Sequence, residues 1–290
     1  MQSNNNADTV PEEDRFKYVD DLTILQLVCL SGLLSDYNIM QHVASDIGLD
    51  QKYLPSESYP MQDQLNNIAN WTEDNLMKLN EQKCNYMIFS RTQENFITRL
   101  HINNHTLDQI AVTQLLGVWI SEDLSWSKNT KEICRKAYSR MSMLTKLRYI
   151  GVNIEDLIRI YVLFIRSITE YCSVAFHSSL TVKQANDIER IQKTSLKVIL
   201  GELYINYQAA LEMWGLQPLY ERREERCLDF ALKCCKHPKN SRIFPLNPRK
   251  EGGVLRAEEK FMVNFARTEA YRKSTIPYCQ RLLNQYFKLK

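Results

Sequence analysis

Residues 16–25 of the chain read Phe16-Lys17-Tyr18-Val19-Asp20-Asp21-Leu22-Thr23-Ile24-Leu25, and the expected fold follows from them. The residues on both sides of the two aspartates are mostly aromatic or β-branched, which favours strands. We therefore expect a β-hairpin with Asp20 and Asp21 at its tight turn. Two like charges at a turn repel each other and gain nothing from packing, so a divalent cation such as Mg²⁺ would offset their cost. The alternative is a solvated turn with two ordinary acids.

The composition indicates a globular protein. The chain has 290 residues, 44% hydrophobic and 24% charged, enough for one large domain or two small ones. Its eight cysteines include no Cys-x-x-Cys pair, and the N-terminus does not read as a secretory signal. We therefore expect reduced thiols in an intracellular protein, in the cytoplasm or the nucleus and not secreted. The longest uncharged apolar-rich stretch, residues 22–35, is too short to span a bilayer, so we expect no membrane partner.

The charge is unevenly distributed along the chain. Residues 1–70 carry eleven acidic and three basic side chains, so the remaining residues must hold a net +11 to give the total of +3. A basic region behind an acidic start suits a protein that contacts phosphates downstream of a metal site. An uneven surface without a partner is the alternative. Cys234, Cys235 and His237 lack a second ligand pair at zinc spacing, so no zinc site is expected.

Hydrophobic spacing predicts mixed elements first and helices afterwards. We expect a helix over 62–80, strands over 84–90 and 96–102, and a strand over 110–120 in which Gly117 indicates a bulge or a close backbone approach. Helices follow over 125–150, 154–172, 181–200, 207–213 and 219–235, then a Pro/Gly linker and a last helix over 257–271. The expected fold class is α+β, with a small antiparallel sheet from about residue 15 to 124 and a helical bundle after it.

The first long helix has two distinct faces. At 100° per residue, Ile133, Ala137, Met141 and Leu144 fall on one side of it. The opposite side carries four cations and two hydroxyl groups, and Glu132 lies off it. Such a one-sign stripe favours contact with a phosphate backbone over a merely solvated face, which would usually mix signs. The stripe consists of Lys128, Lys131, Arg135, Ser139, Ser142 and Lys146.

The order of these pieces resembles one family. Tyr18-Val19-Asp20-Asp21 is followed by Trp71, by Asn75 to Lys83 (Asn-Leu-Met-Lys-Leu-Asn-Glu-Gln-Lys), and by Met87-Ile88-Phe89. Leu115 to Trp126, Tyr171, Phe176-His177 and Ile188 to Lys193 come next. The ordered set resembles the C-terminal half of the palm, and then the thumb, of a reverse transcriptase from a non-LTR (LINE-type) retrotransposon.

The resemblance implies roles for individual residues. Asp20 matches the family's metal-binding carboxylate and Asp21 its neighbour, with Mg²⁺ as cofactor. Tyr18 and Val19 match positions under the primer end and the incoming nucleotide. Lys83 matches the lysine proposed to protonate the departing pyrophosphate, a general-acid role; a surface lysine at a turn is the alternative. Leu116, Gly117 and Val118 match the hairpin that grips the primer, and the stripe of Lys128, Lys131, Arg135 and Lys146 lies where the thumb would meet the duplex.

The family's fingers and its first metal-binding aspartate would precede the hairpin, where this sequence has few residues. We therefore expect an incomplete RNA-directed DNA polymerase that is inactive alone, with an RNA template and DNA primer as its partners. A non-catalytic nucleic-acid-binding module and a decayed open reading frame are the alternatives. The expected domains are a partial palm (1–124), a thumb-like helical bundle (125–240), and a linker with a helical tail (241–290). The oligomeric state does not follow from the sequence.

Overall fold

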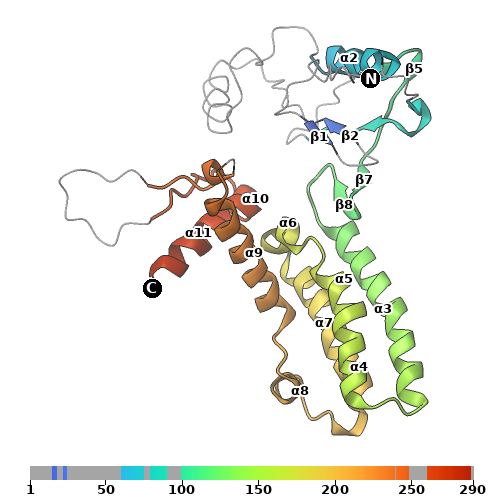
Figure 1. Cartoon of the computed structure of the whole chain (residues 1–290), viewed down its shortest axis with the longest axis vertical. Helices are drawn as coiled ribbons and strands as arrows, with labels where there is room; N and C mark the ends of the chain where they lie inside the picture. Colours follow the sequence, from blue (N-terminus) through green and yellow to red (C-terminus); the bar gives the residue numbers. More distant parts are fainter. Residues whose placement is uncertain are drawn as a thin grey trace, which may run out of the picture. The chain divides into compact units, whose positions relative to one another are not determined.

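The computed structural model describes residues 15–17, 22–24, 60–74, 79–89, 99–238, 240–247 and 260–288. The chain divides into two compact units, Met1–Ala111 and Val112–Lys290. Throughout the described ranges the fold is mainly helical with small two-stranded sheets (Figure 1). The expected α+β class is therefore confirmed in its coarse form, with helix as the dominant component.

The first unit contains the two strands of the expected hairpin. Strands β1 (Arg15–Lys17) and β2 (Leu22–Ile24) pair antiparallel, with Phe16 opposite Thr23. The residues that join them, Tyr18 to Asp21, lie outside the described residues. The structure therefore shows the paired strands and leaves the two aspartates as a prediction.

Short strand pairs and one helix make up the rest of the described first unit. Strands β4 (His101–Ile102) and β5 (His105–Thr106) pair antiparallel, and β3 (Asn85–Tyr86) pairs in parallel with β6 (Asp108–Gln109). Helix α2 (Pro60–Asp74) is followed by the 3₁₀ turn η3 (Glu81–Lys83). The described strands thus form separate pairs, whereas we expected one continuous antiparallel sheet.

One amide side chain ties α2 to β4. Gln62 Nε2 donates to the His101 carbonyl at 2.8 Å, and Gln62 Oε1 accepts from the His101 amide at 2.9 Å. Behind this contact, Ala69, Leu100, Ile102 and Leu107 form a small buried cluster. The cluster thus joins α2, through Ala69, to the strand pair β4–β5 and its neighbours.

The second unit begins with a hairpin. Strands β7 (Val112–Leu115) and β8 (Val118–Ser121) pair antiparallel. Leu116 and Gly117, which join them, have φ of 47° and 82°, as a type I′ turn requires at both central positions. The strand expected over 110–120, with an irregularity at Gly117, is therefore two paired strands, and the chain reverses at Leu116 and Gly117. The reversal was not expected from the local sequence, because leucine rarely adopts positive φ.

Helices form the rest of the second unit. Helix α3 packs along α7, and α11 packs against α9 (Figure 1). The segment η4 is a π-helix between α4 and α5. The helical segments are α3 (Ser127–Tyr149), α4 (Ile154–Ile160), η4 (Tyr161–Arg166), α5 (Ser167–Glu170), α6 (Ser173–Phe176), η5 (His177–Ser179), α7 (Val182–Leu200), η6 (Gly201–Leu203), α8 (Tyr207–Trp214), α9 (Leu219–Lys236), η7 (Ser241–Ile243), α10 (Glu269–Arg272) and α11 (Thr275–Lys288).

Local sequence signals account for the long helices. The expected apolar face of α3 is buried, as Ile133, Ala137, Met141 and Leu144 show. Thr181 caps α7 in a reciprocal capping box with Gln184, and the helix ends at Gly201 with φ 55°. These predictions are confirmed, because caps and amphipathic faces depend on residues close in sequence.

The start of α9 depends instead on a distant residue. The Glu189 carboxylate, from α7, accepts from the amides of Leu219 and Tyr220 at 3.0 and 3.1 Å. It also accepts from the Tyr207 hydroxyl. Pro218 supplies no side-chain cap at this position, so Glu189 satisfies the first amides of α9 from another helix.

The C-terminal segment departs from expectation. The helix expected over 257–271 is wrong, because residues 260–268 are not helical and the final helix is α11, Thr275–Lys288. Asn284 explains the difference: its Oδ1 accepts from the Phe261 amide at 2.8 Å and its Nδ2 donates to the Phe261 carbonyl at 2.9 Å. The backbone of Phe261 is thus bound to α11 and to a β-bridge with Leu246.

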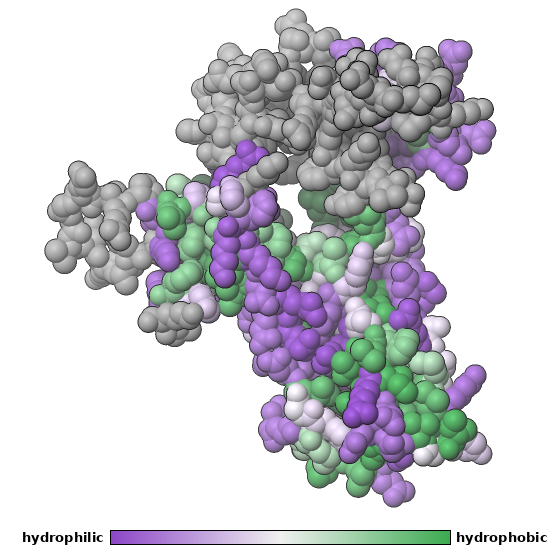
Figure 2. Space-filling view, in the orientation of Figure 1, coloured by the Kyte–Doolittle hydropathy of each residue, from purple (hydrophilic) through white to green (hydrophobic). Residues whose placement is uncertain are grey.

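The surface of the second unit is mixed in character. Figure 2 shows hydrophilic side chains along α9 and apolar ones gathered toward the end of the bundle where α3 gives way to α4. Ile150, Leu203 and Ile205 are among the exposed apolar residues of the unit. Within the described ranges, no helix combines the length and apolar character needed to cross a bilayer.

Candidate functional site

The hairpin is attached to the start of α3 by side-chain hydrogen bonds. The Trp119 amide donates to Asn129 Oδ1 at 3.2 Å. The Asp123 carboxylate accepts from the Ser121 hydroxyl at 2.5 Å and from the Ser125 amide at 2.9 Å. These two bonds, that from Ser121 most strongly, lower the pKa of Asp123 below its ordinary value. The carboxylate is thus held in the charged form that closes the junction.

Tyr171 attaches the other end of the hairpin. Its hydroxyl donates to the Leu116 carbonyl at 2.8 Å, and its ring lies beside Gly117, where an added Cβ would be 3.5 Å from the ring. A side chain at position 117 would crowd this ring only moderately, so the positive φ of the turn is the stronger reason for glycine there. Leu116, one of the residues matched to the primer-gripping hairpin, is therefore bound to Tyr171, the residue that follows α5.

A cleft of about 340 Å³ lies between the hairpin, α3 and α5. The hairpin contributes Gly117, Val118 and Trp119 to its lining. The lining from α3 comprises Asn129, Glu132, Ile133, Lys136 and Arg140, and that from α5 and the residue after it comprises Ser167, Ile168 and Tyr171. Two of the predicted primer-contacting residues thus line a hollow together with cations of α3. The volume falls within the range of small-ligand pockets.

The predicted basic stripe is exposed along α3, but an acid partly neutralises it. Glu132 binds Arg135 at 2.8 Å and Lys128 at 3.5 Å. The hydrogen bond from Arg135 lowers the pKa of Glu132 below its ordinary value. The Lys128 ammonium also lies 4.9 Å from the centre of the Trp119 ring. Lys131 and Lys146, by contrast, are exposed and form no ion pair with any described residue.

Sequence analysis missed two cations of α3 that line the cleft, Lys136 and Arg140. Arg140 Nη1 donates to the Phe164 carbonyl of η4 at 2.8 Å, which holds the guanidinium against η4. π-Helical segments such as η4 often occur at functional sites. The signal in the sequence was the spacing of Glu132, Lys136 and Arg140 by four residues, which places them on one line of the helix beside the stripe.

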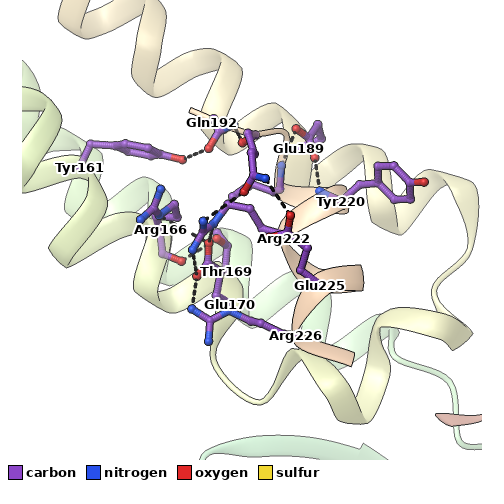
Figure 3. Close-up of polar contacts among 12 residues, drawn as sticks. Tyr161, Arg166, Thr169, Glu170, Glu189, Gln192, Tyr220, Arg222, Glu225 and Arg226 are labelled. Carbon is purple, nitrogen blue, oxygen red and sulfur yellow. Dashed lines mark hydrogen bonds and ion pairs between the residues drawn. The ribbon is translucent and has the colours of Figure 1, made fainter. Parts of the chain in front are cut away.

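An ion-pair cluster holds α5, and hence one wall of the cleft, against α9. Figure 3 shows Arg166, Arg222 and Arg226 converging on Glu170. The Glu170 side chain is only 6% exposed, and Arg226 binds it at 2.6 Å. Burial raises the pKa of Glu170, but hydrogen bonds from Arg222 and Arg226 outweigh burial and leave the pKa below its ordinary value. The carboxylate is therefore charged at neutral pH.

A polar network beside this cluster joins η4, α7 and α8. Gln192 is fully buried; its Oε1 accepts from the Tyr161 hydroxyl at 2.5 Å, and its Nε2 donates to the Tyr207 hydroxyl at 2.8 Å. Burial raises the pKa of Tyr161 well above its usual value, so the phenol stays neutral and donates. The π-helical turn next to the cleft is fixed by this bond.

The residues that line the cleft all belong to the second unit. Lys83 is exposed in η3, in the first unit. Asp20, Asp21, Tyr18 and Val19 lie outside the described residues. The part of the chain that the structure describes contains no group of three or more His, Cys, Asp or Glu side chains able to hold a metal.

The described residues therefore show a basic helix beside a cleft of about 340 Å³, while the polymerase site stays a prediction. No protein-family model, curated protein or solved structure matches the chain, so its function has to be inferred from the cleft and from α3.

Proposed function

We propose that this chain is a retroelement-derived protein whose second unit binds nucleic acid through α3. The charge of α3 carries the proposal: the helix holds seven basic side chains and one acidic side chain, Glu132. That acid is already bound to Lys128 and Arg135. Lys131, Lys136 and Lys146 are left exposed without an ion pair among the described residues. Lys131, Arg135 and Lys146 share one face of the helix, and cations on one face suit the phosphates of a nucleic-acid backbone.

The resemblance to a non-LTR reverse transcriptase supplies the kind of nucleic acid. On that resemblance the ligand is an RNA template paired with a DNA primer, α3 belongs to the thumb, and Leu116, Gly117 and Val118 contact the primer. The packing of the β7–β8 hairpin onto α3 supports this proposal, because a strand that follows α3 would also meet the hairpin. Asp20 and Asp21 would hold Mg²⁺, which neutralises phosphate charge in nucleotidyl transfer.

Removal of two exposed cations tests the binding proposal. For Lys131→Gln/Lys146→Gln, we expect weaker binding to a DNA duplex and a plot of log K against log [salt] that is shallower by about 2. The matched control is Lys233→Gln/Lys236→Gln on α9, which makes the same change in charge. Fluorescence anisotropy over a salt series measures both. Equal salt slopes for the two double variants would contradict the proposal, as would a failure of the unmodified chain to bind.

A second test concerns catalysis. On the resemblance, these 290 residues contain one of the family's two metal-binding aspartate segments, and half of a metal site leaves the reacting groups unaligned. We therefore expect no extension of a DNA primer on an RNA template by this chain in the presence of Mg²⁺. The assay is gel-resolved primer extension, with Asp20→Asn/Asp21→Asn as the background. Synthesis that is lost in the aspartate variant would overturn the prediction of inactivity.

A further inference from the structure

The cleft beside α3 has a composition that differs from the open face of the helix. Its lining combines the apolar side chains of Val118, Ile133 and Ile168 with the cations Lys136 and Arg140. Trp119 and Tyr171 add two aromatic rings. The phosphates of a duplex lie on its outer surface, and a protein binds them with cations and without an apolar cleft. A single nucleotide carries both a flat apolar base and an anionic phosphate, which matches this lining.

An unpaired hydrogen-bond donor is buried at the same place. Asn129 is 4% exposed, its Oδ1 is occupied by the Trp119 amide, and its Nδ2 has no partner among the described residues. A buried donor without an acceptor destabilises the folded state. Asn129 is one of the residues that line the cleft, and nucleobases offer ring nitrogens and carbonyl oxygens, the kind of acceptor that this donor lacks.

The charge of the cleft also favours an anion. Glu132 is the acidic residue in the lining, and its carboxylate is bound to Arg135 and Lys128 outside the cleft. Lys136 forms no ion pair with the described residues. Arg140 uses Nη1 for the Phe164 carbonyl, which leaves its other donors for a phosphate oxygen. Tyr171, 57% exposed, lies at the rim with its ring against the hairpin turn.

We propose that this cleft holds one unpaired nucleotide, with its base against the aromatic and apolar lining and its phosphate on Lys136 and Arg140. The proposal rests on the proposed function, because the nucleotide belongs to a strand whose backbone follows α3. It adds a preference: nucleic acid with an unpaired nucleotide binds more tightly than a fully paired duplex, in which every base is stacked inside the helix.

Two substitutions of Tyr171 isolate the role of the ring. Tyr171→Phe and Tyr171→Leu both remove the hydroxyl bond to Leu116, but only the leucine variant removes the aromatic ring. Loss of a base–aromatic stack weakens binding by about tenfold or more. We therefore expect the leucine variant to bind a fifteen-residue oligothymidylate about tenfold more weakly than the phenylalanine variant, and the two to bind a blunt duplex equally. Fluorescence anisotropy with the full chain measures all four affinities.

Adenosine monophosphate and a charge variant provide independent tests. Adenosine monophosphate should change the tryptophan fluorescence of the chain, through Trp119, one of its four tryptophans, and the change should be absent in Lys136→Gln. That variant should lose more affinity for the oligothymidylate than for the duplex, and Lys233→Gln should lose neither. Circular dichroism checks that each variant is folded.

The outcomes separate this inference from the proposed function. Equal single-strand affinities for the two Tyr171 variants, with no response to adenosine monophosphate, would overturn the nucleotide site while salt-dependent binding by α3 survives. If neither probe binds the unmodified chain, the proposed function fails and the nucleotide site fails with it.

Discussion

Replacement of Glu170 with glutamine is expected to destabilise the protein by about 3 kcal/mol. Glu170 is the shared anion of Arg166, Arg222 and Arg226 and is only 6% exposed. Removal of one partner from a buried ion pair costs about 3–5 kcal/mol, because the opposite charge is left without compensation. We place the effect at the low end, since the Arg226 side chain is 48% exposed and can return to water.

Urea unfolding followed by far-ultraviolet circular dichroism measures this change at pH 7. The control is Asp187→Asn, which removes a surface partner of Arg190 at 3.5 Å and should cost no more than about 0.5 kcal/mol. Because the folded pKa of Glu170 lies below its ordinary value of 4.5, its contribution is complete above pH 4.5. It is lost as the pH falls through the folded value. Similar unfolding midpoints for the two variants would show that the cluster does not hold α5 to α9.

The free energy of unfolding is also expected to decrease by about 2 kcal/mol between pH 7 and pH 5, because of His177. Burial, assisted by the charge of Arg223, lowers the pKa of His177 from 6.5 to about 4. In the unfolded chain His177 is protonated as the pH falls below about 6.5, whereas in the folded chain it is protonated only near pH 4. Stability is full above pH 6.5 and falls with decreasing pH, by about 3 kcal/mol in total.

The surroundings of His177 explain why it stays neutral. Arg223 Nε donates to His177 Nδ1 at 3.4 Å, which assigns the proton of the ring to Nε2. Nε2 lies 3.4 Å from the Tyr278 hydroxyl, which donates to Glu224 at 2.7 Å. The Tyr220 ring packs beside the imidazole. A proton on Nδ1 would break the bond to Arg223 and place two cations together.

His177→Asn tests this expectation, since asparagine keeps an acceptor and cannot titrate. Unfolding free energies of the variant should depend on pH by about 2 kcal/mol less than those of the unmodified chain between pH 7 and pH 5. Few carboxylates titrate in that range, so the difference isolates the histidine. An unchanged pH dependence in His177→Asn would mean that His177 titrates normally.

The candidate site was only partly accessible from the sequence. The basic stripe of α3 followed from the spacing of Lys131, Arg135 and Lys146, because residues on one helix face recur every three or four positions. The cleft did not follow, because Tyr171 and Leu116 are 55 residues apart when they meet. Lys136 and Arg140 belong to the same helix as the stripe, yet only the approach of the hairpin and α5 turns their side of α3 into a lining.

The β7–β8 hairpin and the final helix α11 also depend on tertiary contacts that the local sequence does not predict. Leu116 adopts positive φ because strand pairing and Tyr171 hold it there, whereas leucine by itself disfavours that conformation. Residues 260–268 have apolar spacing, yet Asn284 binds the Phe261 backbone and the helix forms later, at Thr275–Lys288. In both places tertiary contacts overrule the local preference.

Four features follow from the amino-acid sequence without any tertiary contact: the amphipathic face of α3, the Thr181 cap of α7, the end of that helix at Gly201 and the excess of cations after residue 70. Each of these depends on side chains within about four residues of one another, or on composition alone. Three other features depend on tertiary packing: the meeting of three arginines at Glu170, the capping of α9 by Glu189, and the cleft beside α3. Those features join residues from different helices, because buried charges and unpaired amides must find partners wherever packing brings them.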